Sequence, residues 1–195
     1  MRAILWACML AAAGALCLTG CSTAPKTVEG RTDLDQTVRH TIDVARQTDP
    51  GIQGFVDSSA GYAIFPTVGK GAIAVGGAFG RGELIQGGKM VGYCSLTQAT
   101  VGAALGGQKY SELIFFETPE AVERFKSGNY TFAAQASAVA LKSGASANAK
   151  YADGVAVFTV GEEGLMVEAS VGGQKFSFQP VAVAQNVPPQ PVPTP

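Results

Sequence analysis

A period-two alternation of side-chain size in residues 61–80 is the feature that most restricts the fold of this chain. Residues that alternate in this way line opposite faces of a β-strand, whereas helical residues on one face recur every three or four positions. One face here is made of small residues, and such a face lets another backbone or sheet approach closely. The segment is therefore expected to be a strand. Its larger side carries Ile73, Val75 and Phe79, and its small side carries Ala72, Ala74, Gly76 and Ala78.

Alternating segments recur along the rest of the chain and predict further strands. Two glycine-rich stretches, 161–164 and 172–174, have the composition of hairpin turns and are expected to join the last three strands. The expected strands cover residues 93–105, 110–116, 132–141, 155–160, 165–171 and 176–178.

Helical spacing appears before the first strand. Leu34, Val38, Ile42 and Ala45 recur at helical intervals from Thr32 onward, and the pattern ends at residues 49–51, which read Asp-Pro-Gly. Residues 52–59 are expected to add one or two further helical turns.

One more helix is expected within the sheet. Thr118 and Pro119 supply an N-cap and a proline at the first helical position, and Gly128 supplies the end. The buried side of this helix would carry Ala121, Val122 and Phe125. The pattern as a whole predicts an α+β domain, with an N-terminal helix followed by a strongly curved antiparallel sheet or partial barrel that has one inserted helix.

The N-terminus has the organisation of a bacterial lipoprotein precursor. Arg2 precedes an apolar run, residues 3–18, which is too short to span a bilayer comfortably but suits a signal peptide. Residues 18–21 read Leu-Thr-Gly-Cys, the pattern of a lipobox, so Cys21 is the predicted site of lipid attachment. Acyl chains on that cysteine would anchor the chain. Ser22, in place of Asp, favours the outer membrane, and we expect a lipid-anchored envelope protein that faces the periplasm.

These features divide the chain into four parts. Its last eight residues contain five prolines, which favour an extended, exposed tail. The expected parts are a signal peptide at 1–20, a tether at 21–31, a folded domain at 32–180 and a proline-rich disordered tail at 181–195.

The charge of the chain is nearly balanced. Arg2 is one of 14 basic residues, so cleavage leaves 13 basic against 15 acidic residues and a net charge of −2, which does not favour nucleic acid as a partner. Residues 66–150 carry eight basic and five acidic side chains, and this mild excess suits either an anionic headgroup or an ordinary solvated surface.

The residues needed for catalysis or metal binding are scarce. His40 is the only histidine, and Cys94 is the only cysteine beyond Cys21, so a zinc site of the common Cys/His types cannot form. A dyad of His40 and Cys94 would require the first helix to dock over the strand of Cys94. We expect no catalytic residues, no metal and no cofactor, and Cys94 is expected to be a buried apolar residue.

Several motifs together resemble the SYLF domain, a lipid-binding module named from yeast actin-patch and plant FYVE proteins. They lie at residues 61–66 (GYAIFP), 107–116 (GQKYSELIFF), 125–128 (FKSG) and 164–170 (GLMVEAS), and the likeness covers roughly residues 35–179. The resemblance implies binding of membrane lipids without enzymatic activity. The chain departs from eukaryotic members at residues 93–96, where Tyr-Cys-Ser-Leu replaces Trp-Ser-x-Pro, and in its first helix, where aspartates offset the arginines.

The sequence therefore favours a non-catalytic module that contacts phospholipid or anionic headgroups at the envelope. An envelope structural or protein-interaction role, with lipid contact only through Cys21, is the alternative, and an enzyme is a third hypothesis. The candidate headgroup-binding residues are Lys70, Arg81, Lys89 and Lys109, which punctuate the glycine-rich strands.

Overall fold

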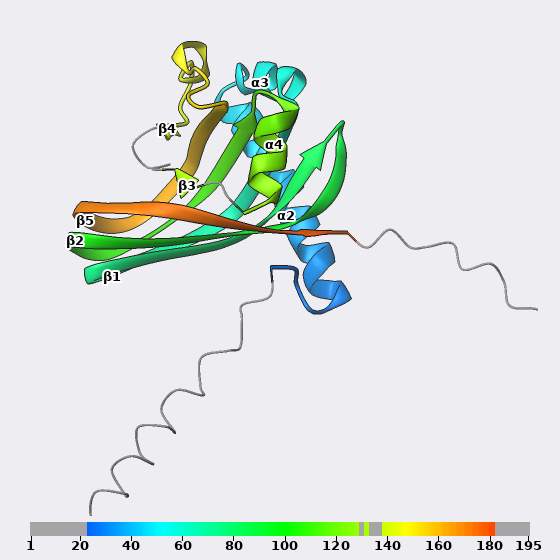
Figure 1. Ribbon diagram of the computed structural model, residues 1–195. Helices are drawn as coiled ribbons and strands as arrows, with labels where there is room; N and C mark the ends of the chain where they lie inside the picture. Colours follow the sequence, from blue (N-terminus) through cyan, green and yellow to red (C-terminus); the bar gives the residue numbers. More distant parts are fainter. Residues whose placement is uncertain (1–22, 129–130, 133–137, 182–195) are drawn as a thin grey trace, which may run out of the picture.

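The computed structural model describes residues 23–128, 131–132 and 138–181 (Figure 1). The expected signal peptide, Cys21, most of the proline-rich tail and the middle of the strand expected at 132–141 lie outside the described residues. None of the described helices is long and apolar enough to cross a membrane.

The fold is α+β. Helices α2 (Val28–Thr48) and α3 (Ile52–Ser58) precede the long strands β1 (Gly61–Gln86) and β2 (Lys89–Phe116). Helix α4 (Pro119–Lys126) follows, and then β3 (Thr131–Phe132), β4 (Val139–Ala140), the short helix η1 (Ser146–Asn148) and β5 (Val155–Pro180).

The described strands form one open sheet in the order β1-β2-β5-β3, and β4 also pairs with β5. The β4–β5 pair is parallel, so the sheet is mixed and the expectation of a purely antiparallel sheet was wrong at this pair. The remaining pairs are antiparallel, and β1 and β3 stand at the two ends of the order.

Local signals place the helices. The side chain of Thr27 accepts a hydrogen bond from the Gly30 amide at 3.1 Å, so α2 begins at Val28, inside the segment expected to be a tether. The Thr118 hydroxyl caps α4 in the same way at Ala121, and α4 buries Ala121, Val122 and Phe125. The predictions for α3 and α4 are confirmed.

Three long strands replace the shorter ones that the sequence predicts. The expected hairpin turns at 161–164 and 172–174 are wrong, because β5 continues through both stretches. Gly161 and Gly164 do have positive φ angles, of 65° and 102°, but Gly161 lies in the register shift opposite Lys109–Ser111 of β2, and Gly164 pairs with Gln108 next to it. The glycines therefore belong to a β-bulge, which needs the same backbone conformation as a turn.

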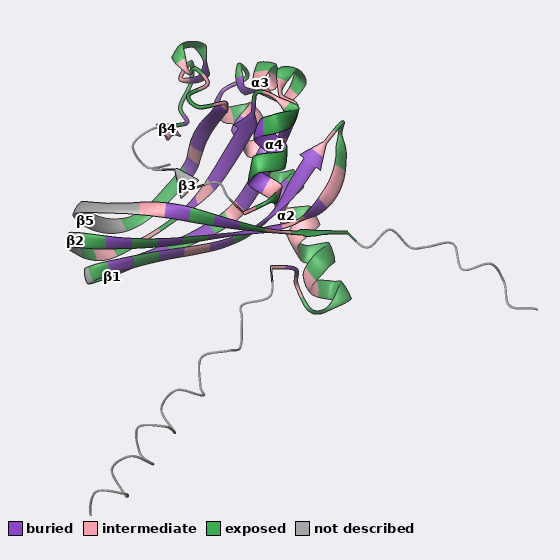
Figure 2. Cartoon of the chain, in the orientation of Figure 1, coloured by how far each residue is buried: buried purple, intermediate pink, exposed green. Residues whose placement is uncertain are grey.

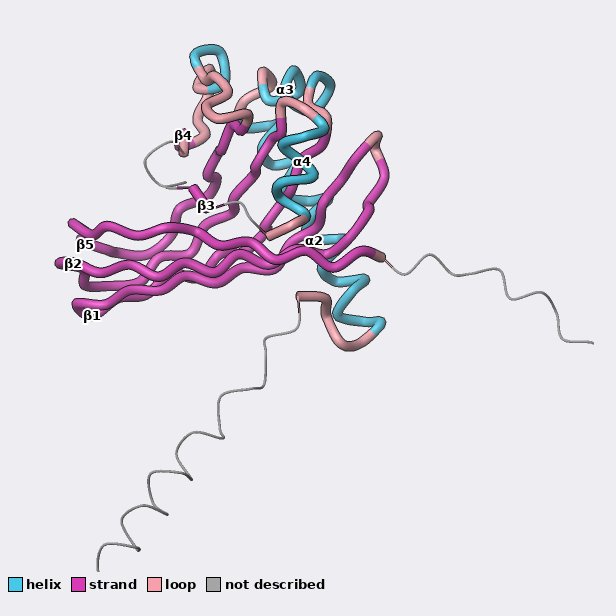
Figure 3. Tube along the Cα trace, viewed as in Figure 1, coloured by secondary structure: helices cyan, strands magenta, loops and turns pink. Residues whose placement is uncertain are grey.

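Strand β1 folds back on itself. A side chain added at Gly82 would collide with the carbonyl oxygen of Ile64, and one added at Gly80 would lie 2.9 Å from a methyl group of Val68. Residues 61–68 therefore lie against residues 80–86, and Figure 3 shows the three long strands turning back at the same end of the sheet. The close approach that the small face of β1 predicts is found here.

The pairing register shows where the turn-back occurs. Ile73 pairs with Leu105 and Val75 pairs with Val101, so one residue of β1 lies opposite three residues of β2. The additional length lets β2 pass around the outside of β1. We call residues 72–76 of β1 and 100–106 of β2 the bend.

Two hydrophobic clusters hold the layers together (Figure 2). One lies between the folded-back halves of the strands and α4, where the rings of Phe65 and Phe125 lie 5.8 and 5.2 Å from the ring of Phe176. The other lies under α2 and α3 and includes Ile42 and Phe115. Both clusters lie away from the bend.

Candidate functional site

The outer surface of the bend exposes large aliphatic side chains. Ile73 and Val75 of β1 are 81% and 66% exposed, and Val101 and Leu105 of β2 are 71% and 67% exposed. The register places them on neighbouring pairs, so they form one patch, which we call the apolar tip. Contiguous apolar surface on a soluble domain commonly marks an interaction site.

The buried face of the sheet at and beside the bend is polar. Lys70 and Gln98 are each 4% exposed, and Thr100 and Gln174 are each 1% exposed. Apolar side chains usually point inward and polar ones outward, so this end of the sheet has its polarity reversed. The small residues Ala72 and Gly76, also buried, leave space for this polar interior.

The structure separates the four basic residues that the sequence singled out. Lys70 is buried on the inner side, Lys109 is exposed and pairs with Gly69, and Lys89 lies beside the β1–β2 turn at the other end of the hairpin. The guanidinium of the exposed Arg81 lies 5.2 Å from the centre of the Phe79 ring. They do not form one basic site, and Lys70 is shielded from a headgroup at the surface.

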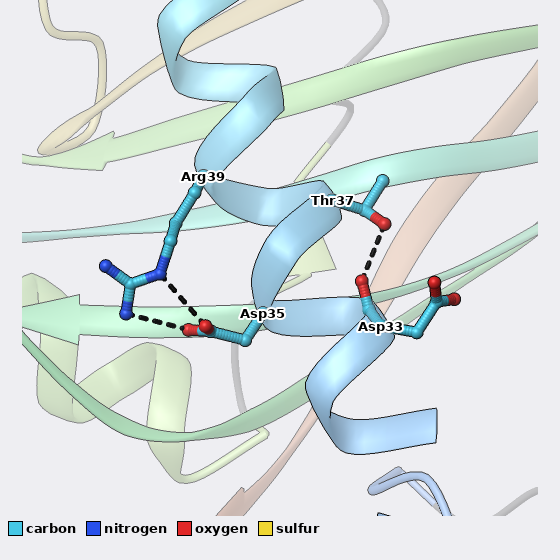
Figure 4. Close-up of polar contacts among 4 residues, drawn as sticks. All are labelled: Asp33, Asp35, Thr37 and Arg39. Carbon is cyan, nitrogen blue, oxygen red and sulfur yellow. Dashed lines mark hydrogen bonds and ion pairs between the residues drawn. The ribbon is translucent and has the colours of Figure 1, made fainter. Parts of the chain in front are cut away.

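A groove of about 310 Å³ lies between α2 and the β1–β2 hairpin and contains charged groups. Arg39 donates two hydrogen bonds to Asp35, at 2.9 and 3.1 Å, and Arg46 pairs with Asp43 at 3.2 Å (Figure 4 shows the first pair). The aspartates therefore neutralise Arg39 and Arg46.

Glu83 lines the same groove. Burial raises the pKa of its carboxyl to about 7, the neighbouring Asp35 adds to this rise, and Arg39 opposes it. Near neutral pH this groove therefore changes its charge by titration of Glu83.

A smaller cavity of about 140 Å³ lies over the inner face of the paired strands β2 and β5. Glu112 and Gln174 both line it and are each 1% exposed. The amide nitrogen of Gln174 donates to Glu112 at 3.0 Å. Burial raises the pKa of Glu112 to about 7, although this hydrogen bond lowers it.

The structure does not bring His40 and Cys94 together. His40 is exposed on α2 and lines a groove with Lys109, whereas Cys94 is buried in the cluster of Phe65 and Phe176. Burial, with a contribution from Glu83, raises the pKa of the Cys94 thiol well above its ordinary value, which disfavours the nucleophilic thiolate. Within the described residues, no three His, Cys, Asp or Glu side chains are grouped so as to hold a metal ion.

Comparison with known proteins finds a family match in the second half of the chain. Residues 97–182 match the family model of Ysc84, described as Las17-binding protein actin regulator, which is the SYLF family. The SYLF resemblance is confirmed for this part of the chain. The SYLF match includes Val101 and Leu105 of the apolar tip, and also Glu112 and Gln174.

One relative extends the likeness. Beta cell expansion factor A of Aeromonas veronii is 29% identical over 129 residues, which are 65% of this chain and 49% of that protein. The chain thus covers about half the length of this relative.

The apolar tip could not be recognised from the sequence without knowing which face of β1 is covered. Its signal was present in the alternation of Ile73 and Val75 with small residues. If the small face had been assigned to the interior, the aliphatic face would have been predicted to be exposed.

Proposed function

We propose that this chain is a lipid-anchored bacterial envelope protein with a non-catalytic SYLF domain, and that the apolar tip contacts the membrane. The exposure of Ile73, Val75, Val101 and Leu105 carries the proposal. Water contact with these side chains is unfavourable, and the interfacial region of a bilayer removes them from water without requiring a matching protein surface.

The reversed polarity of the bend favours lipid as the contact. Polar side chains at 98, 100 and 174 are held inside, where they stay away from acyl chains, and the outer surface offers aliphatic groups. The tip stands at one end of the sheet, apart from the helices (Figure 1). Lys109, four pairing positions from Leu105, and Lys175 of β5 are exposed basic residues suited to anionic headgroups.

The N-terminal lipobox supports the anchoring part of the proposal. Cys21 would carry the acyl groups, and Ser22 favours an outer-membrane protein that faces the periplasm. α2 begins at Val28, so few residues separate the acylated cysteine from the folded domain. A short connection of this kind keeps the domain close to the bilayer.

Vesicle binding tests the proposal. Trp6, in the signal, is the only tryptophan of the chain, so a protein that begins at Ser22 contains none. In such a protein, Val101→Trp places a single fluorophore on the tip, and Val28→Trp places one on α2, where Val28 is 71% exposed. Phosphatidylcholine vesicles containing phosphatidylglycerol should shift the emission of the Val101→Trp protein to the blue and leave that of the Val28→Trp protein unchanged.

Salt separates the two parts of lipid contact. Contact through lysines should weaken at high ionic strength, whereas insertion of the tip should persist. A protein that shows neither vesicle sedimentation nor a spectral shift at low salt would refute lipid binding by the domain.

An envelope protein-interaction role is the second candidate, because the matched family is described as Las17-binding. On that hypothesis the tip would contact a protein, and lipid contact would come only from Cys21. Crosslinking from position 101 in intact cells distinguishes the two, because lipid binding predicts lipid adducts and protein binding predicts protein adducts.

A further inference from the structure

The cavity over the inner face of β2 and β5 has the composition of a small ligand site. It is lined by two strands and by Ala138 and Ala140, it opens to the surface, and its volume of about 140 Å³ suits a molecule of a few heavy atoms. Its polar lining comes from both strands, and comprises Gln108, Tyr110 and Glu112 of β2 and Thr159, Glu162 and Gln174 of β5.

Two buried oxygen atoms in this lining lack a hydrogen bond. Glu112 Oε2 accepts from Gln174 Nε2, but Glu112 Oε1 and Gln174 Oε1 have no hydrogen-bond partner in the described part of the chain. Both side chains are 1% exposed. Buried acceptors are nearly always satisfied in folded proteins, so these two indicate a missing donor.

The charge of the lining indicates the nature of that donor. Glu162, at the exposed side of the cavity, adds a second carboxylate, whose Oε1 accepts from Thr159 Oγ1 at 3.1 Å. Lys70 pairs with Gln108 through the backbone but does not line the cavity. A ligand that brings N–H donors and a positive charge would complement this lining.

A protonated amine fits better than a metal ion. Calcium takes six to eight oxygen ligands and magnesium six, at fixed short distances, whereas the lining offers two carboxylates of which one is already bonded to an amide. A primary ammonium group has three donors and requires no fixed coordination geometry.

We propose that this cavity binds a small protonated primary amine, whose ammonium group donates to Glu112 Oε1 and Gln174 Oε1 while Glu162 contributes its charge at the entrance. The same chemistry is found in the ethanolamine headgroup of a phospholipid and in free alkylamines. The proposal does not depend on lipid binding, because a free amine would occupy the site equally.

Calorimetric titration of the chain that begins at Ser22 tests this site. Ethanolamine is the ligand, choline is the matched control that keeps the charge but has no N–H donor, and ethylene glycol is the control without charge. Ethanolamine should bind and raise the unfolding temperature, because a ligand of the folded state stabilises it, and choline and ethylene glycol should do neither.

Variants locate the site. Glu112→Gln should weaken ethanolamine binding by about tenfold or more, the usual effect of losing one charged hydrogen-bond partner. Glu117→Gln changes an exposed carboxylate one residue after the end of β2, and this protein should bind as the wild type does. Glu162→Gln changes only an exposed side chain and should weaken binding several-fold, which keeps the test informative if the Glu112 variant fails to fold.

Vesicles distinguish the two sources of the amine. If phosphatidylethanolamine vesicles compete with free ethanolamine and phosphatidylcholine vesicles do not, the lipid headgroup occupies the site, and if neither competes, the ligand is a free amine. Equal binding of choline and ethanolamine, an unchanged affinity in a folded Glu112→Gln protein, or stabilisation by calcium but not by ethanolamine would overturn the proposal.

Discussion

The apolar tip gives a quantitative prediction for membrane partitioning. Val75 and Val101 expose about two thirds of their surface, and burying a whole valine side chain stabilises by roughly 1.5–3 kcal/mol, so each residue can contribute about 1–2 kcal/mol on insertion. Threonine keeps the β-branched shape that suits a strand but exchanges a methyl group for a hydroxyl. The double change Val75→Thr, Val101→Thr should therefore cost about 2 kcal/mol, which lowers the vesicle partition coefficient roughly thirtyfold.

Sedimentation with vesicles at high salt measures this effect without the contribution of the lysines. Val28→Thr is the matched control, because Val28 is as exposed as Val101 but lies on α2. Unfolding in urea should give similar free energies for all three proteins, since exposed positions contribute little to stability. Equal partitioning of the double variant and the wild type, or an equal loss in the Val28 variant, would refute insertion of the tip.

Three further predictions test the anchor, a buried carboxyl and the turn-back of β1. In cells that express the full chain, Cys21→Ala should abolish incorporation of a palmitate analogue into this protein. Equal labelling of the wild-type and variant proteins would exclude Cys21 as the attachment site. The pKa of Glu112 is about 7 in the folded chain, against an ordinary value of 4.5. Between these two values the folded chain keeps a proton that the unfolded chain releases. The free energy of unfolding should therefore fall by up to about 3 kcal/mol as the pH rises from about 4.5 to about 7. Glu112→Gln should reduce this fall, as measured by urea unfolding at several pH values. Part of the fall should remain, because the pKa of Glu83 is also about 7. An unchanged pH dependence of the free energy of unfolding would contradict the burial of Glu112. Gly82→Ala should lower the free energy of unfolding by about 1–3 kcal/mol or more, because the added methyl group collides with the Ile64 carbonyl. Gly71→Ala should not lower it, because a methyl group added there contacts no other atom. Equal stability of the two variants would contradict the folded-back strand.

The parts of the fold that local chemistry decides were predictable from the sequence. Thr118 and Pro119 fix the start of α4, and the buried side of that helix follows from its spacing. The continuity of β5 was not predictable, because a turn and a bulge both place glycine at positive φ. Only the pairing of β5 with β2 distinguishes them.

The candidate site was less predictable than the fold. A register shift between Phe65 and Val68 of β1 changes which alternate residues face inward, and this places Lys70 inside rather than on the surface. The carboxyl of Glu112 meets Gln174 across 62 residues of sequence, and no local pattern records that meeting.

The packing of β1 also explains why the aliphatic side chains of the tip remain outside. A slip of one residue in β1 would bring Ile73 and Val75 to the inner face. That face has no room for them, because even a methyl group added at Gly76 would collide with the hydroxyl of Thr100 and lie 3.0 Å from Ala72. The small residues that let the strand fold back thus also keep the aliphatic residues in contact with water until a membrane or another partner covers them. The exposure of the tip is therefore a consequence of the fold itself, and local rearrangement cannot remove it.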